Sequence, residues 1–413
     1  MPERFFTQPL ANGLMLLGQP MDNVSSAAMA MLVPAGASHD PDGLEGAAYV
    51  ATEWRLRGAA QRDSRQLNDA LDSLGIDHDE SVLSAHLEFS MAQLGANLPQ
   101  AIELLADIVL RPRFEDDTFD PCRDLTLQDL ASLEDEPARK CNILLRERFF
   151  PYPLGRNILG SEQSLAAMTP QAVRSHCTKI APHDAILAVA GNFDWPKFVE
   201  MAKRSFGDWS AKAPAKVNTK PIAGGLLHVK KDSAQQHIAL AHNAVPMGDA
   251  RSYQALMAEK VLSGGMSGRL FTEVREKRGL VYHVSTRYAS MKSHAGFFTY
   301  AGTRPQVAQE TLDVTVGELK RLSEGISHEE MTRARTQLKS ALVMQGESTV
   351  ARAHTLAADW YHLNRLRGLH EISAAVDNVT ASDVIDYLRQ FPAGNFTILT
   401  VGPEELDISA ING

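Results

Sequence analysis

Cysteine is scarce in this chain of 413 residues: Cys122, Cys141 and Cys177 lie far apart, with no CxxC spacing. So sparse and odd a set excludes a disulfide framework and a thiolate metal site, and it is typical of a reducing compartment. We therefore expect three buried free thiols.

Long apolar runs are also missing. No stretch of about 18 or more apolar residues occurs, so we expect no membrane-spanning helix. The start, Met1 to Phe5, has no charged segment followed by an apolar one and does not indicate a signal peptide. The expected compartment is the cytoplasm, or the periplasm if a leader has been removed.

Basic residues are fewer than acidic ones, with 41 Lys and Arg against 50 Asp and Glu, for a net charge of -9. This balance argues against nucleic acid or an anionic membrane surface as the main partner. A composition with 44% hydrophobic and 22% charged residues is typical of a globular protein. The length favours two domains of about 200 residues each.

An internal repeat supports this division. Each of two segments has a Thr that begins a short helix, then a continuous apolar run, then a Gly. Three pairs of residues are each separated by 211 positions: Thr169 and Thr380, Val173 and Val384, Gly191 and Gly402. A constant separation indicates duplication, and each apolar run predicts a strand that is covered on both faces.

Between the copies, residues 210–221 combine two prolines with small residues and no apolar period, which is typical of a linker. We predict an N-terminal domain over 1–209, a linker over 210–222 and a C-terminal domain over 223–413. Alternating or apolar runs predict strands, and amphipathic periods predict helices. The strands are expected at 27–33 and 84–91, and the helices at 64–74, 99–110, 305–322 and 329–345. This mixture predicts two related α+β halves.

Several segments, taken in order, carry a family resemblance. They are 43–58, 66–75, 98–109, 134–137, 153–160, 267–282 and 347–348. Together they resemble the pitrilysin/insulinase family of zinc peptidases, which includes the mitochondrial processing peptidase, over nearly the whole chain. The resemblance implies two homologous halves, each with a mixed or antiparallel sheet packed with helices, the pitrilysin-type (LuxS-like) metallohydrolase fold.

The zinc motif of that family is absent. Active members read Gly-Leu-Ala-His-x-x-Glu-His here, with two imidazoles one helical turn apart to hold zinc and a carboxylate to act as general base. This chain has Tyr49, Thr52 and Glu53 at the three motif positions, and the third-ligand position falls on Asp129. We predict no metal, no cofactor and no catalytic residue in this chain alone. Whether Glu53 and Asp129 bind any ion is left open.

The first half lacks the family's zinc motif, but the second half keeps another feature of the family. Arg275 and Tyr282 match the spacing of the family's Arg/Tyr pair, which the resemblance implies is a substrate contact. Both side chains can donate hydrogen bonds to a peptide carbonyl or a developing oxyanion. The alternative is that Arg275 pairs with Glu273 or Glu276 and that Tyr282 is a core aromatic. Gly279 is expected to end the helix between them in a left-handed conformation.

The leading hypothesis is a non-catalytic, substrate-binding subunit of a two-chain zinc peptidase. Its partners would be a homologous subunit that carries the zinc, and peptide substrates. A structural scaffold, resembling core proteins of a respiratory complex, is one alternative. A self-paired, inactive peptide-binding protein is another.

Overall fold

The computed structural model describes residues 3–211, 216–221, 224–409 and 411, so part of the predicted linker, residues 212–215 and 222, lies outside the described residues. By its internal contacts the chain forms two units. The first comprises Met1–Ser132, Tyr152–Lys220 and Gln345–Leu366, and the second comprises Leu133–Pro151, Pro221–Met344 and Arg367–Gly413. No helix among the described residues is long and apolar enough to cross a membrane.

The first unit is built on a six-stranded mixed sheet in the order β1-β2-β8-β3-β7-β6. Its strands are β1 (Phe6–Pro9), β2 (Met15–Pro20), β3 (Ser26–Val33), β6 (Asp77–Val82), β7 (Leu87–Leu94) and β8 (Ile186–Gly191), and a small ribbon joins β4 (Gly58–Ala59) to β5 (Arg62–Asp63). Its helices are α1 (Ala47–Arg55), α2 (Ser64–Ser73), α3 (Leu98–Leu110), α4 (Phe119–Ser132), α6 (Glu162–Ala167), α7 (Pro170–Cys177), α8 (Trp195–Phe206) and α12 (Thr349–Leu363).

The second unit is built on a five-stranded mixed sheet in the order β11-β12-β10-β13-β9. Its strands are β9 (Gly225–Lys230), β10 (Gln236–Ala244), β11 (Val281–Ser290), β12 (Ala295–Thr303) and β13 (Thr397–Gly402). Its helical segments are α5 (Pro137–Phe149), α9 (Ser252–Ser263), the π-helix η4 (Phe271–Glu276), α10 (Ala308–Arg321), α11 (His328–Glu347), α13 (Leu369–Asn378) and α14 (Ala381–Gln390). The part of α11 up to Met344 belongs to this unit.

The two sheets share one topology. The order β6-β7-β3-β8-β2 of the first matches β11-β12-β10-β13-β9 of the second, strand for strand in chain order. In each sheet one pair of neighbouring strands is parallel, namely β2 with β8 in the first and β9 with β13 in the second, and the other neighbouring strands are antiparallel. The predicted α+β fold with two homologous halves is confirmed.

The repeat landmarks take the predicted conformations. Thr169 caps α7 by accepting a hydrogen bond from the amide of Ala172, and Thr380 caps α14 in the same way through Asp383. The strands that follow, β8 and β13, are buried along their whole length. Both are interior strands of their sheets, which explains the continuous apolar runs in the sequence.

One predicted strand, 84–91, begins later than expected, at Leu87. The carbonyl oxygens of Ser84 and Ala85 accept hydrogen bonds from the amides of Ser38 and Gly36. Because these groups are bonded to a loop, they do not pair within the sheet. Residues 87–94, along which buried and more exposed side chains alternate, are the part that forms the strand.

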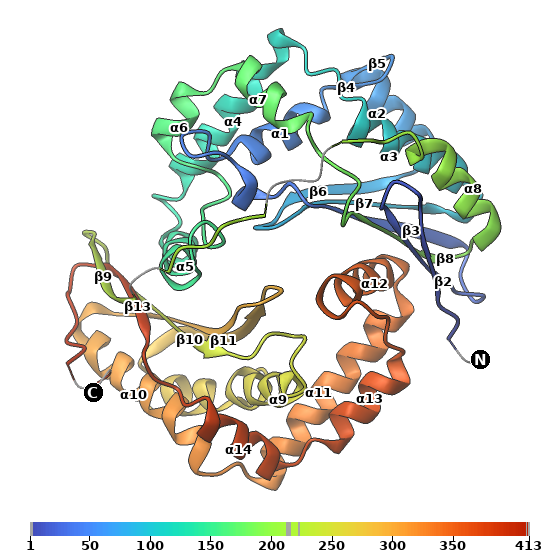
Figure 1. Cartoon of the computed structure of the whole chain (residues 1–413). Coiled ribbons are helices and arrows are strands. Elements are labelled where there is room, and N and C mark those ends of the chain that lie inside the picture. Colours follow the sequence, from blue (N-terminus) through green and yellow to red (C-terminus); the bar gives the residue numbers. More distant parts are fainter. Residues whose placement is uncertain (1–2, 212–215, 222–223, 410, 412–413) are drawn as a thin grey trace. The chain divides into compact units, whose positions relative to one another are not determined.

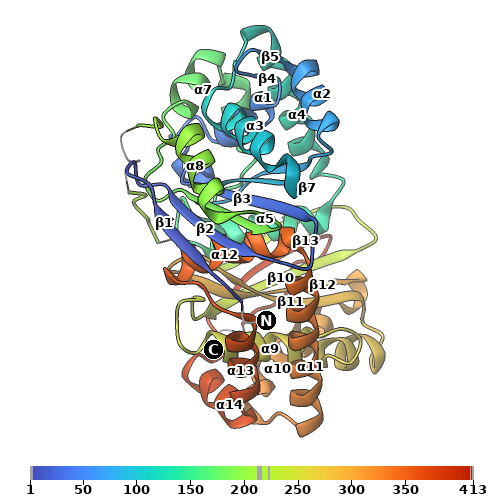
Figure 2. The same ribbon diagram turned by 90° about the vertical axis from the view of Figure 1, so that its right-hand side faces the viewer.

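The structural units also differ from the predicted domains 1–209 and 223–413 in two segments. Helix α5 packs against β10 and β13 of the second sheet, and α12 packs against β2, β3 and β8 of the first. The colours of Figure 1 make this visible within each unit, since the red-orange helix α12 lies beside blue strands and the teal helix α5 lies near the red strand β13. Figure 2 shows α12 against the blue strands from a second side.

Side-chain size on the two faces of the first sheet explains this packing. Because side chains alternate along β3, Met29, Met31 and Val33 enter the larger core, which α3 and α8 also line. The other face carries small residues, among them Ala28 and Ala30, in one cluster with Ala353 and Ala357 of α12. Small side chains on both partners let the helix lie close to the strands.

Candidate functional site

Helix α1 carries the three altered motif positions, and its start is fixed by an acidic side chain. The carboxylate of buried Asp40 accepts hydrogen bonds from the amides of Gly46 at 3.0 Å and Ala48 at 3.1 Å. Gly46 has a left-handed backbone with φ of 90°, and a Cβ there would lie 2.6 Å from the carbonyl oxygen of Leu159. The glycine and the aspartate together set where α1 begins.

The first and third ligand positions meet in space. Tyr49, on α1, donates a hydrogen bond from its hydroxyl to Oδ2 of Asp129, on α4, over 3.0 Å. Helices α1 and α4 pack against each other, which brings the two side chains together. The family's spacing, which selected residue 129 from sequence alone, therefore agrees with the geometry.

The remaining motif positions cannot replace the missing imidazoles. Thr52 is buried, and its hydroxyl donates to the carbonyl oxygen of Ala48 in its own helix at 2.8 Å. Burial raises the pKa of Glu53; Arg57 opposes the shift, and the nearby carboxylates of Asp129 and Glu80 add to it. Carboxylates that already repel one another are costly to keep charged without a cation.

This residue set does not fit a catalytic zinc site. Such a site needs three protein ligands with at least one open position, and in this family two of them are imidazoles. Here Tyr49 uses its hydroxyl on Asp129 and Thr52 uses its hydroxyl on the backbone. Among the described residues, no group of three or more His, Cys, Asp or Glu side chains could hold a metal ion.

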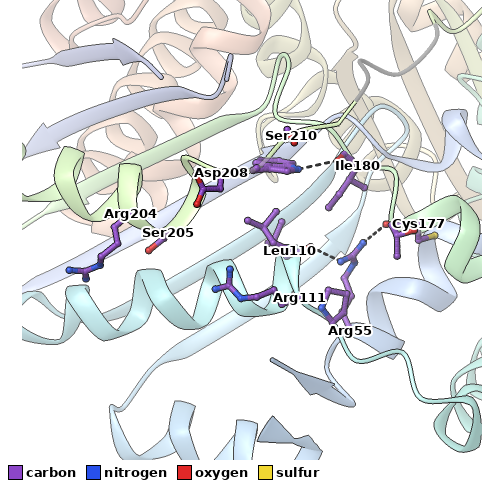
Figure 3. Close-up of a pocket in the computed structure, with 13 residues that line it drawn as sticks. Arg55, Leu110, Arg111, Cys177, Ile180, Arg204, Ser205, Asp208 and Ser210 are labelled. Atoms are coloured by element: carbon purple, nitrogen blue, oxygen red, sulfur yellow. Dashed lines mark hydrogen bonds between the residues drawn. The ribbon is translucent and has the colours of Figure 1, made fainter. Parts of the chain in front are cut away.

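Sequence reasoning missed Arg55, the last residue of α1. Its side chain is fully buried and donates to the carbonyl oxygens of Val109 at 2.7 Å and Cys177 at 2.8 Å. Figure 3 shows the guanidinium reaching both acceptors, at the ends of α3 and α7. It forms no ion pair with any described residue, and burial lowers the pKa of Arg55 to about 10.

Arg55 is explained by the two helix ends that it joins. The last carbonyl groups of a helix have no partner within the helix and carry partial negative charge. The guanidinium of Arg55 satisfies carbonyls at two such ends and fixes α1 to both helices. It also lines a pocket of about 330 Å³, together with Ser205 and Trp209. The sequence signal that could have identified Arg55 is a charged residue on the apolar face of a helix.

In the second unit, Arg275 lies on the π-helix η4 and is exposed. Its guanidinium lies 4.9 Å from the ring centroid of Phe271, and it forms no ion pair with any described residue. Glu273, one of the two partners considered from sequence, is instead paired with Lys277 at 2.7 Å and Arg278 at 3.1 Å. The donors of Arg275 are therefore available to another molecule.

Tyr282 is not a core aromatic, because 65% of its surface is exposed. It sits at an irregularity in β11, where Val281 pairs with Thr303 and His283 with the adjacent Gly302, which leaves Tyr282 as the extra residue. Bulges of this kind redirect a side chain out of the regular alternation. Gly279 ends the preceding helix with φ of 62°, as predicted. The role of Arg275 and Tyr282 as substrate contacts stays a prediction.

Comparison with known families agrees with this fold. Residues 19–162 match the model described as insulinase (peptidase family M16), and residues 167–338 match the model described as peptidase M16 inactive domain. The chain belongs to peptidase family M16. At positions 49, 52 and 53 its sequence lacks the zinc motif of the family.

Relatives and solved structures span nearly the whole chain. A protein of Rickettsia felis named "uncharacterized zinc protease" is 29% identical, with 98% of this chain and 99% of the relative covered. The crystal structure titled peptidase M16 inactive domain from Pseudomonas fluorescens has a TM-score of 0.89 at 20% identity, covering 98% and 99% of the two chains. A protease from Helicobacter pylori has a TM-score of 0.90 at 18% identity, covering 97% and 100%. These structures establish the fold.

Proposed function

We propose that this chain is the non-catalytic, substrate-binding subunit of a two-chain zinc peptidase, and that a homologous partner subunit carries the zinc. One observation carries the proposal: the metal positions are chemically replaced, while Arg275 and Tyr282 keep exposed, uncommitted donors at the family's spacing. A subunit that had no further role with peptides would have no need of such donors. The partner would supply the hydrolytic chemistry.

The side chains of the pair suit a peptide in an extended conformation. A guanidinium offers up to five donors and a phenol offers one, and both can bind a peptide carbonyl or the oxyanion that develops on it. Exposed sheet edges offer further backbone groups for strand addition, a common mode of peptide binding. The bulge at Tyr282 interrupts the regular pairing of an edge strand, β11, and directs the phenol away from it.

The decisive experiment mixes this chain with a zinc-bearing homologue, which is to be sought among the proteins that co-purify with it from its source. We expect peptide cleavage by the mixture to exceed cleavage by that homologue alone. Arg275→Ala should lower kcat/KM by roughly a hundredfold to a thousandfold, as expected when one oxyanion donor is removed. Tyr282→Phe should lower it about tenfold, since it removes one hydrogen bond to a charged group.

Lys277→Ala provides the matched control, because Lys277 is an exposed cation beside the same helix end and is committed to Glu273. It should leave kcat/KM unchanged. Co-sedimentation must show that all variants still assemble. If Arg275→Ala and Tyr282→Phe assemble and leave cleavage unaffected, the chain is a scaffold. If the pure chain pairs with itself, binds peptide and has no zinc-bearing partner, it is the self-paired binding protein.

A further inference from the structure

The first unit contains a second pocket, of about 590 Å³, between the end of β3 and the segment that follows α7. Its walls are mainly apolar and include Pro34, Ala35, Leu87 and Ile180. Pockets for small molecules are typically of 300–1,000 Å³, roughly, with apolar walls and a few polar groups that fix orientation. The polar groups here are Ser38, His39, His176, Thr178, Lys179 and Lys216.

Two of these polar groups are incompletely satisfied. Ser38 is 5% exposed, and its Oγ atom has no hydrogen-bond partner among the described residues. The Nδ1 atom of His39 is likewise buried without a partner. Buried polar atoms are nearly always bonded, so such orphans mark places where a ligand or a water is expected. Both residues line the pocket.

The charge in the pocket favours an anion. Lys179 and Lys216 line it, and neither forms an ion pair within the described part of the chain. The buried carboxylate of Asp40 accepts hydrogen bonds from the amides of Gly46 and Ala48, and it lies 3.3 Å from Nε2 of His176. Asp40 itself does not line the pocket, and these three groups satisfy its carboxylate. Burial lowers the pKa of His39, which keeps that ring neutral near neutral pH.

We propose that this pocket binds a carboxylate joined to an apolar group, with the carboxylate against Lys179 and Ser38 and the apolar group on Ala35, Leu87 and Ile180. Two sources have this chemistry: a free monocarboxylic acid, and the C-terminal residue of a peptide that ends in an apolar side chain. A phosphate or a dicarboxylate fits less well, because most of the wall offers it no polar partner.

This inference goes beyond the proposed function and does not depend on it. The pocket lies wholly within the first unit, whereas Arg275 and Tyr282 belong to the second. Binding can be measured on the full chain alone, with no partner subunit and no cleavage assay. Failure of one proposal would leave the other untouched.

Isothermal titration of the full chain tests the site directly. N-acetyl-leucine and hexanoate should each bind at one site per chain, and N-acetyl-leucinamide, which lacks the charge, should bind at least tenfold more weakly. Lys179→Met should weaken N-acetyl-leucine about tenfold, which corresponds to one charge-assisted hydrogen bond. Because Lys179 is exposed, the variant should melt at the temperature of the parent chain.

The neighbouring pocket supplies the control. Cys177, Thr178 and Ile180 line both pockets, but Ser205 lines only the one beside Arg55, shown in Figure 3. Ser205→Ala should leave binding unchanged, while Ser38→Ala should weaken it severalfold. A leucine-ended peptide that displaces N-acetyl-leucine identifies the peptide source, and its failure to compete identifies the free acid. Equal binding of acid and amide, no binding of either acid, or an unaffected Lys179→Met overturns the proposal.

Discussion

The phenol of Tyr49 donates a hydrogen bond to Oδ2 of Asp129 over 3.0 Å, at the two positions where the family places the first and third zinc ligands. In an active relative, a metal ion would join the two helices that carry these residues. Here a direct contact joins α1 to α4. The substitution at residue 49 thus keeps a structural link while it removes a ligand.

Removing this link should cost stability. We expect Tyr49→Phe to lower the free energy of unfolding by about 1 kcal/mol, the usual net contribution of one hydrogen bond. Urea denaturation of the full chain measures it. Asp129→Asn is the matched control: its amide oxygen can still accept from the phenol, so the loss should be smaller. A Tyr49→Phe variant as stable as the parent would show that the contact contributes nothing.

Restoring the ligands should restore the metal. The combined variant Tyr49→His, Thr52→Glu and Glu53→His places two imidazoles at i and i+4 of α1, with Asp129 as the carboxylate ligand. After dialysis against zinc and removal of the excess, we expect about one zinc per variant chain and much less in the parent. Metal analysis by mass spectrometry provides the readout. Equal zinc in both chains would contradict this interpretation of the site.

The half-buried carboxylate of Glu53 should make stability depend on pH. Burial raises its pKa in the folded chain, so the folded state holds the proton more tightly than the unfolded state does. As pH rises through the window between the ordinary and the raised pKa, this group therefore destabilises the fold. Glu53→Gln should be more stable than the parent at roughly pH 7 and equal to it at roughly pH 4. Urea titrations at both values measure the difference, and a variant that is no more stable at the higher pH is the contrary result.

Local signals in the sequence were sufficient to predict the internal repeat. The capping roles of Thr169 and Thr380 could be predicted because a helix cap needs only a side-chain oxygen close to a free backbone amide, and both groups are near each other in sequence. Ser327 and Glu330 form a capping box of the same local kind, and the two residues exchange hydrogen bonds of 2.8 and 3.2 Å. The positions that correspond to the family's metal ligands were predicted from the spacing of the family motif.

Other features depend on contacts between distant segments. Arg55 can be buried only because the ends of α3 and α7 meet beside it, and neither end is near it in sequence. The exchange of α5 and α12 is of the same kind. The two helices begin 212 positions apart, at Pro137 and Thr349, and correspond to each other in the repeat, yet each packs on the sheet of the other half. Periodicity identifies a helix, and it does not specify the sheet on which the helix packs.

This exchange predicts that half of the sequence will not fold alone. Residues 1–209 lack α12, so the face of the first sheet that carries Ala28, Ala30 and Ile186 would be open to water. We expect that fragment to unfold without a sharp thermal transition and to bind a hydrophobic dye. Residues 1–209 joined through a flexible linker to 345–366 should regain a cooperative transition, measured by circular dichroism. The same joined chain with Ala353→Asp and Leu356→Asp is the control, because two buried charges should prevent docking of the helix. If residues 1–209 alone melt as cooperatively as the joined chain, α12 is not needed to complete the first unit.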